Sequence, residues 1–153
     1  MQAYRLVKAR YADTALDGSG AKAQSGRWNS KGVRMVYASD SVALAALELL
    51  VHLHRSAVLN RYVLLSLELH DESGMVLDDS ALPPDWRGDP PPSSTAAIGD
   101  EWIASGLALA LAVPSTLVPQ QRNVLVNPAH AQYKAVIAAA SAEPFNFDPR
   151  LVR

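Results

Sequence analysis

The chain has 153 residues, of which 49% are hydrophobic and 19% charged, and its formal net charge is −1. This balance predicts one folded domain over residues 1–153 with a substantial core, and it excludes wholesale disorder. The near-neutral charge, with no block of Lys and Arg, argues against direct nucleic-acid binding, and the lack of cysteine excludes disulfides, thiolate nucleophiles and cysteine-ligated metal sites. The N-terminus lacks the order of a signal peptide and the apolar stretches are too short to span a bilayer, so we expect a cytoplasmic protein that does not associate with a membrane.

The first part of the chain predicts two strands followed by a helix. Residues 4–7 and 33–38 favour the extended state, and the small and turn-forming residues of 12–26 predict a loop between them. Residues 39–41 (SDS) offer N-cap groups for a helix that we expect from residue 42 to about 55. Apolar side chains surround this helix almost completely, which predicts that it is buried.

The rest of the chain mixes strands and helices without a regular β-α-β alternation. Residues 61–70 predict a central strand, and residues 78–97 contain five prolines and predict a long surface loop. The other expected elements are a strand at 75–77, a helix at 100–110, an apolar segment at 111–113, a last strand at 123–126, a final helix at 129–140 and a docking tail at 145–147. This pattern predicts an α+β domain with a mixed β-sheet core and flanking helices, rather than a doubly wound sheet.

The first candidate for chemistry is the run GRWNSKG at residues 26–32. The guanidinium of Arg27 could bind phosphate oxygens in pairs, because it is planar and always charged. Gly26 and Gly32 would let the backbone approach a ligand closely. The competing interpretation is a surface arginine packed on Trp28, and the spacing does not choose between the two.

Three further residues are candidates. Tyr37 could present its ring to a nicotinamide or adenine base, although an ordinary core aromatic fits the pattern at least as well. Glu48 lies in an otherwise apolar helix, so its carboxylate is either at a wet edge or buried with a partner, and we favour an acid/base or electrostatic group facing a cleft. Ser115 has no evident His–Asp pair to activate it, so it is a better hydrogen-bond donor to a ligand than a nucleophile, or else a turn residue.

The sequence predicts no metal site. His52 and His54 are two residues apart, so on a helix they would point to different faces. The sequence also lacks the phosphate-binding loop of nucleotide triphosphatases, the dinucleotide glycine fingerprint and the Gly-x-Ser-x-Gly nucleophile motif.

Six segments, in order through nearly the whole chain, resemble the RES domain: GRWNS at 26–30, VYAS at 36–39, ALAALELLVH at 43–52, IGDEW at 98–102, VPS at 113–115 and NVLVNPAH at 123–130. The domain is named for an Arg, a Glu and a Ser, which correspond here to Arg27, Glu48 and Ser115. The tyrosine of the family corresponds to Tyr37.

The resemblance implies the toxin of a bacterial type II toxin–antitoxin pair, with an Xre-type helix-turn-helix antitoxin as its partner. It also implies a fold similar to that of ADP-ribosyltransferases and NAD⁺ as the substrate. Members of the family consume NAD⁺ as glycohydrolases or phosphorylases, and some transfer ADP-ribose to a protein. In ADP-ribosyltransferases the catalytic glutamate comes late in the chain on a strand, so the role of Glu48 does not carry over from them.

The residues fit this chemistry. Breaking the nicotinamide–ribose bond develops positive charge on the ribose, which Glu48 would stabilise, or else Glu48 would orient the acceptor. Arg27 would hold the pyrophosphate, Tyr37 would stack on the nicotinamide end, and Ser115 would bond to the carboxamide or a phosphate. Two weaker candidates for binding NAD⁺ are Asn123 and Arg5.

Three functions stay open: an NAD⁺ glycohydrolase or phosphorylase, a protein ADP-ribosyltransferase, and a non-catalytic module that holds a nucleotide or peptide in the Arg27 cleft. The acceptor also stays open, as does the choice between a homo-oligomer and a hetero-oligomer with the antitoxin. Residues 82–95 could form a lid or a partner contact, but a plain surface loop is favoured. The site requires Ser115 to fold back onto the region of Arg27 and Glu48.

Overall fold

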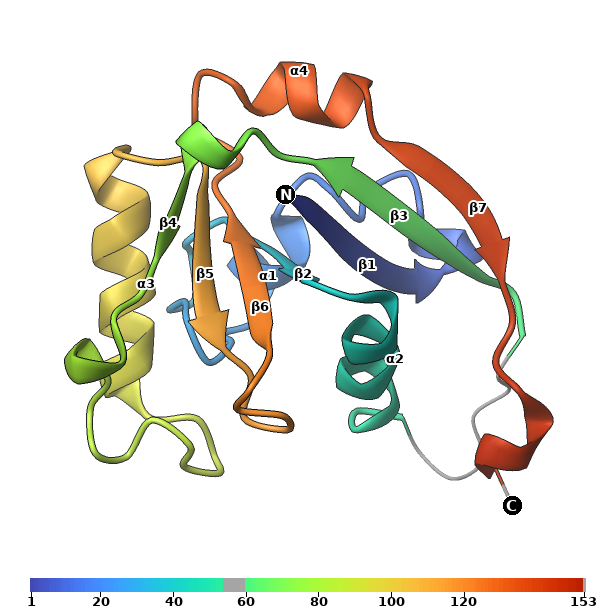
Figure 1. The fold of residues 1–153 in the computed structure, drawn as a ribbon, viewed down its shortest axis with the longest axis horizontal. Helices are drawn as coiled ribbons and strands as arrows, with labels where there is room; N and C mark the ends of the chain where they lie inside the picture. Colours follow the sequence, from blue (N-terminus) through green and yellow to red (C-terminus); the bar gives the residue numbers. More distant parts are fainter. Residues whose placement is uncertain (54–59, 153) are drawn as a thin grey trace.

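The computed structural model describes residues 1–53 and 60–152. They fold around a seven-stranded sheet (Figure 1). The strands are β1 (Gln2–Lys8), β2 (Val36–Ser39), β3 (Tyr62–Glu68), β4 (Gly74–Val76), β5 (Ala110–Pro114), β6 (Arg122–Val126) and β7 (Ser141–Phe145). Their order is β4-β5-β6-β2-β1-β3-β7, and all neighbours are antiparallel except the parallel pair β4 and β5. The predicted α+β domain with a mixed sheet is therefore confirmed.

The described residues form four α-helices around this sheet: α1 (Ser19–Ala23), α2 (Val42–Leu50), α3 (Ser93–Ser105) and α4 (Tyr133–Ala138). Helix α2 begins where predicted, because the hydroxyl of Ser41 accepts a hydrogen bond of 3.1 Å from the amide of Leu44. It packs on β1 and β2, whereas α3 runs alongside β4 and β5 (Figure 1). Within the described part of the chain, no helix is long and apolar enough to cross a membrane.

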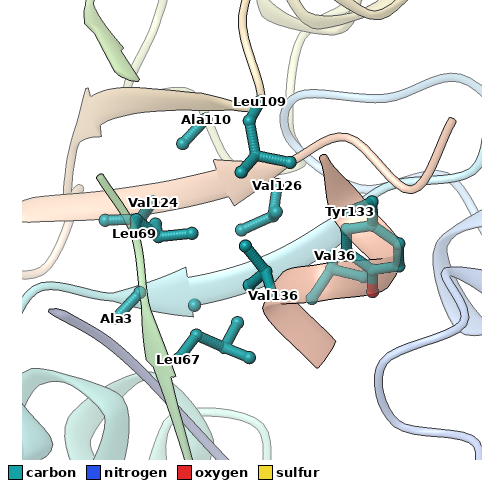
Figure 2. Close-up of a cluster of buried hydrophobic side chains, with 11 residues drawn as sticks. Ala3, Val36, Leu67, Leu69, Leu109, Ala110, Val124, Val126, Tyr133 and Val136 are labelled. Atoms are coloured by element: carbon teal, nitrogen blue, oxygen red, sulfur yellow. The ribbon is translucent and has the colours of Figure 1, made fainter. Parts of the chain in front are cut away.

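The two faces of the sheet bury different side chains, because successive strand residues point to opposite sides. Figure 2 shows one face, where Val36, Val124 and Val126 pack against Tyr133 and Val136 of α4. The opposite face is covered in two parts. One cluster packs residues of β5 and β6 against α3 and the segment before β2: Trp28, Met35, Trp102, Leu111, Val113 and Leu125. The other packs residues of β1 and β3 against α2 and the C-terminal segment: Leu6, Ala45, Tyr62, Leu64 and Phe147.

The sheet opens between β1 and β2. These two strands share one paired position, Tyr4 with Ser39, whereas β1 pairs with β3 along its whole length. Beyond that pair the guanidinium of Arg5 spans the opening, and its Nη1 donates to the carbonyl of Tyr37 at 2.6 Å. A side chain thus takes over the connection where the ladder of backbone hydrogen bonds stops.

The helix predicted from residue 42 to about 55 is shorter than expected. Helix α2 ends at Leu50, and residue 55 lies outside the described residues. It is also not buried all round, since Leu44 and Ala45 are its buried residues whereas Leu47 is 45% exposed. The physical reason is that α2 packs with one side on β1 and β2 and leaves its other side to solvent.

Other predicted boundaries were wrong in several places along the chain. The loop at 78–97 ends earlier, because α3 begins at Ser93 after Pro92, and the left-handed conformation of Gly106 (φ 62°) ends α3 before residue 110. The short helix α1 lies inside the expected loop at 12–26, β2 starts later, at residue 36, and α4 is shorter than expected. Strand β7 replaces part of the expected tail, so β7 and not β6 is the last strand. Phe147 still docks, with its ring centroid 5.3 Å from that of Tyr62.

Candidate active site

Glu48, Ser115 and Asn123 meet through one carboxylate oxygen. The Oε1 atom of Glu48 accepts a hydrogen bond of 2.9 Å from the hydroxyl of Ser115 and one of 2.6 Å from the Nδ2 of Asn123. Glu48 lies in α2, Ser115 directly follows β5, and Asn123 lies in β6, so three separate elements contribute. The predicted return of Ser115 to Glu48 is confirmed. No hydrogen bond among the described residues reaches the other carboxylate oxygen, Oε2.

Ser115 is fully buried, and its hydroxyl takes part in three hydrogen bonds. It donates to Glu48 and accepts from the backbone amides of Leu117, at 3.1 Å, and Val118, at 3.2 Å. A nucleophilic serine would need a base to take its proton and an open path to the substrate. This geometry instead makes Ser115 a holder of the carboxylate. Its one proton goes to Glu48, so the expected hydrogen bond from Ser115 to the carboxamide or a phosphate of NAD⁺ is not what this structure shows.

Ser39 extends the cluster and was missed as a site residue from the sequence, which treated it as an N-cap candidate. Its hydroxyl donates to the Oδ1 of Asn123 at 2.8 Å, and the two residues lie opposite each other in the β2–β6 register. The N-cap role falls to Ser41 instead. The signal that could have pointed to Ser39 is its place at the end of VYAS, one of the segments that resemble the RES domain, but the pairing of β2 with β6 cannot be derived from the sequence.

The guanidinium of Arg27 faces the loop before α3. Its Nη1 donates to the carbonyls of Trp86 and Gly88 at 2.8 and 2.9 Å. The carbonyl of Arg27 itself accepts from the hydroxyl of the buried Thr95 at 2.6 Å. The hydrogen bonds among described residues therefore fix Arg27 from both ends and engage one of its three guanidinium nitrogens, whereas Nε and Nη2 make no hydrogen bond to those residues.

The same loop also reaches the segment that follows Ser115. The Nη2 of Arg87 donates to the carbonyl of Thr116 at 2.9 Å, and its guanidinium lies 5.8 Å from the ring centroid of Trp86. Residues 86–88 thus connect the turn that carries Arg27 with the turn that carries Ser115. The residues of this stretch lie at the surface, so the interpretation as a surface loop fits them, and a role as a lid or partner contact stays a prediction.

Tyr37 holds the turn on which Arg27 sits. Its hydroxyl donates to the Oδ1 of Asn29 at 2.6 Å and accepts from the amide of Trp28 at 3.0 Å. The amide of Gly26 donates to the same Oδ1 at 3.0 Å. Burial raises the pKa of Tyr37 above its usual value, so the hydroxyl stays protonated as a donor. Its ring packs with the cluster around Trp28 and Leu125, as the core interpretation predicts, and stacking on a nicotinamide stays a prediction.

Arg5 is not brought to Glu48. By strand alternation its side chain shares the β1 face of Ala3 and Val7, opposite to Tyr4, and its Nη1 donates to the carbonyl of Tyr37. Its Nε is buried without a hydrogen-bond partner, and burial lowers the pKa of the guanidinium from its usual value. The structure therefore shows Arg5 as a bridge across the opening of the sheet.

Metal ligands do not gather in the part of the chain that the structure describes, where no group of three or more His, Asp or Glu side chains could hold an ion. His52 follows α2 and is exposed, and His54 lies outside the described residues.

Comparison with known proteins decides the family. The protein-family model described as "RES domain" matches residues 2–148, which is nearly the whole chain. The chain belongs to the RES domain family. This RES domain is 42% identical over 151 residues to "Toxin Res" of Yersinia enterocolitica, and the match covers 99% of each chain. It is 41% identical over 147 residues to "Prs ADP-ribosylating toxin" of Sphingobium sp., covering 94% of this chain and 90% of that one.

The fold of this RES domain is also found in a solved structure. It matches a chain in the crystal structure of the M. tuberculosis MbcT–MbcA toxin–antitoxin complex with a TM-score of 0.73, at 19% identity, covering 99% of this chain and 86% of that chain. The family expected from the six sequence segments is thus confirmed, and the chain is a RES domain toxin.

Proposed function

We propose that this toxin consumes NAD⁺ by breaking the bond between nicotinamide and ribose, with water or phosphate as the acceptor. The observation that carries the proposal is the anchoring of Glu48, whose Oε1 accepts two hydrogen bonds while its Oε2 has no hydrogen-bond partner among the described residues. A carboxylate fixed in this way is already oriented before the substrate arrives. Fixed charges stabilise a transition state well, because they need no reorganisation during the reaction.

The reaction needs a negative charge where the sugar becomes positive. As the nicotinamide leaves with the bonding electron pair, the ribose gains oxocarbenium character, and Oε2 of Glu48 is the oxygen that could face it. Water then adds to the ribose and gives ADP-ribose, nicotinamide and a proton, whereas phosphate would give phosphorylated ADP-ribose. Ser115 and Asn123 contribute by holding the carboxylate.

Arg27 supplies the complementary charge for the substrate. The pyrophosphate of NAD⁺ is anionic, and a guanidinium binds such oxygens in pairs. The carbonyls of Trp86 and Gly88 orient the guanidinium through Nη1, and Nε and Nη2 would then bind phosphate oxygens. Tyr37 supports this role indirectly, because its hydroxyl fixes the turn that carries Arg27.

A second candidate is the transfer of ADP-ribose to a protein. It is favoured by the relative from Sphingobium sp., which is 41% identical and whose name describes it as ADP-ribosylating. The same Glu48 would serve, since only the acceptor near the ribose differs. We also propose a helix-turn-helix antitoxin of the Xre type as the partner, which the family resemblance implies; the solved structure of similar fold is that of a toxin–antitoxin complex.

The proposal is tested by measuring nicotinamide release from NAD⁺ with purified, antitoxin-free protein. We expect release by the wild type and a strong rise in KM for Arg27→Ala, because the pyrophosphate loses its cation. Arg10→Ala, which changes an exposed arginine in the turn after β1, serves as the matched control and should behave as wild type. NAD⁺ that stays intact after prolonged incubation would contradict the proposal and favour a non-catalytic binding module.

The acceptor is tested in a cell lysate supplied with NAD⁺ labelled in the adenylate part. Label on a discrete protein band would identify a transferase, and label in free ADP-ribose or its phosphate a glycohydrolase or phosphorylase. In cells, expression of the toxin alone should stop growth, and co-expression of its antitoxin should restore it.

A further inference from the structure

Ser39 makes a hydrogen bond to the side-chain amide of Asn123, which in turn makes a hydrogen bond to Glu48. The hydroxyl of Ser39 donates to the Oδ1 of Asn123 at 2.8 Å, and the Nδ2 of Asn123 donates to the Oε1 of Glu48 at 2.6 Å. Ser39 is 3% exposed, so water has little access to its hydroxyl. The three side chains form a line from β2 through β6 to α2.

The direction of each hydrogen bond in this line is determined by the carboxylate. An ionised carboxylate can only accept, so the NH₂ group of Asn123 must face Glu48. The Oδ1 of Asn123 must then face Ser39, and the hydroxyl of Ser39 must donate. An amide turned the other way would place its oxygen against the carboxylate oxygen, and the repulsion between these two acceptors disfavours that orientation.

We propose that Ser39 is a positioning residue for the NAD⁺ reaction, acting on Glu48 through the amide of Asn123; this inference rests on the function proposed above. The antiparallel register places Ser39 directly opposite Asn123, so the contact requires no movement of either strand. Without the hydroxyl, the Oδ1 of Asn123 loses its partner and the amide is free to rotate. Glu48 would then keep one firm hydrogen bond, from Ser115, instead of two.

The kinetic test compares Ser39→Ala with Asn123→Ala and with the double variant. We expect Ser39→Ala to lower kcat by about tenfold and to change KM by less than about twofold, because a misplaced carboxylate affects the transition state more than substrate binding. In the Asn123→Ala background the same change should cost nothing further, since the residue through which Ser39 acts is already gone. Multiplied losses in the double variant, or wild-type kcat for Ser39→Ala, would overturn the proposal.

Ser73→Ala is the matched control. Ser73 is also a buried serine, and its hydroxyl donates to the carbonyl of His70 at 2.7 Å in the turn between β3 and β4. Its replacement removes a comparable hydrogen bond outside the Glu48 cluster, so kcat should stay at the wild-type value. A loss equal to that of Ser39→Ala would show a general effect on folding and would overturn the positioning role.

A second readout separates this proposal from the proposed function. The side-chain amide signals of Asn123 in a ¹H–¹⁵N spectrum report its hydrogen bonds directly. We expect them to shift and broaden in Ser39→Ala but not in Ser73→Ala. If the wild type does not turn over NAD⁺, the proposed function fails while this measurement still decides the contact; unchanged Asn123 signals in Ser39→Ala would refute the role of Ser39 in either case.

Discussion

Replacing Glu48 by Gln removes one negative charge from the site and keeps the size of the side chain. Both hydrogen bonds to Glu48 end on Oε1, from Ser115 and Asn123, and the carbonyl oxygen of Gln can accept the same two. The new NH₂ group then occupies the place of Oε2, where it makes no contact that the fold needs. We therefore expect the free energy of unfolding to change by less than about 1 kcal/mol.

The effect on catalysis should be much larger. Two opposite unit charges about 4 Å apart attract each other by roughly 4 kcal/mol at an effective dielectric constant of about 20. The ribose carries only part of a unit charge in the transition state, and Glu48 is half-buried. We expect a loss of roughly 3 to 4 kcal/mol in transition-state stabilisation, which corresponds to a kcat lower by about 10²-fold to 10³-fold.

The assay measures nicotinamide release at saturating NAD⁺, alongside denaturant unfolding to show that the variant is folded. Glu101→Gln provides the matched control, because Glu101 is an exposed glutamate of α3, and it should keep wild-type kcat. A folded Glu48→Gln protein with a kcat within about threefold of wild type would refute the electrostatic role of Glu48.

Two further predictions follow from single contacts, and a third concerns metal ions. A Cβ at Gly99 would lie 1.7 Å from the carbonyl oxygen of Trp28, so Gly99→Ala should lower the free energy of unfolding by about 3 kcal/mol or more. Gly20→Ala is the control, because a Cβ there would have no atom within 4 Å and should leave the free energy of unfolding unchanged. Equal unfolding midpoints for the two variants would contradict the close packing of α3 on the turn that contains Trp28. Tyr37→Phe removes the hydroxyl that bonds to Asn29 and should cost about 1 to 2 kcal/mol and raise KM for NAD⁺, and an unchanged KM would separate Tyr37 from the placement of the turn. Because the sequence predicts no metal site, EDTA should leave NAD⁺ turnover unchanged, and a loss that an added metal ion restores would disprove this expectation.

Part of the site could be predicted from the sequence because residue type alone limits what a side chain does. A single carboxylate in the apolar stretch around Glu48 needs partners, and Ser115 after Pro114 was a suitable donor; the structure joins the two. The start of α2 was also predictable, because the cap is local and uses Ser41. The cap depends on short-range chemistry that adjacent residues determine, whereas the meeting of Ser115 and Glu48, which are 67 residues apart, was expected from the resemblance to the RES domain.

The missed contacts are those that depend on the pairing of distant segments. Ser39 acts on Asn123 because β2 lies beside β6 in one register, and no local pattern specifies that register. The partners of Arg27 are the backbone carbonyls of Trp86 and Gly88. Every residue has a backbone carbonyl, so the sequence does not indicate which ones accept a hydrogen bond from Arg27. The exposed side of α2 was missed for a similar reason, since its apolar residues do not tell which of them the sheet covers.

The central claim is that the anchored Glu48 breaks the nicotinamide–ribose bond, and product analysis by mass spectrometry tests it most directly. Purified toxin without antitoxin is incubated with NAD⁺, with and without phosphate. We predict free nicotinamide in both reactions, together with ADP-ribose in water and its phosphorylated form if phosphate is the acceptor. NAD⁺ recovered intact from both reactions would contradict the claim.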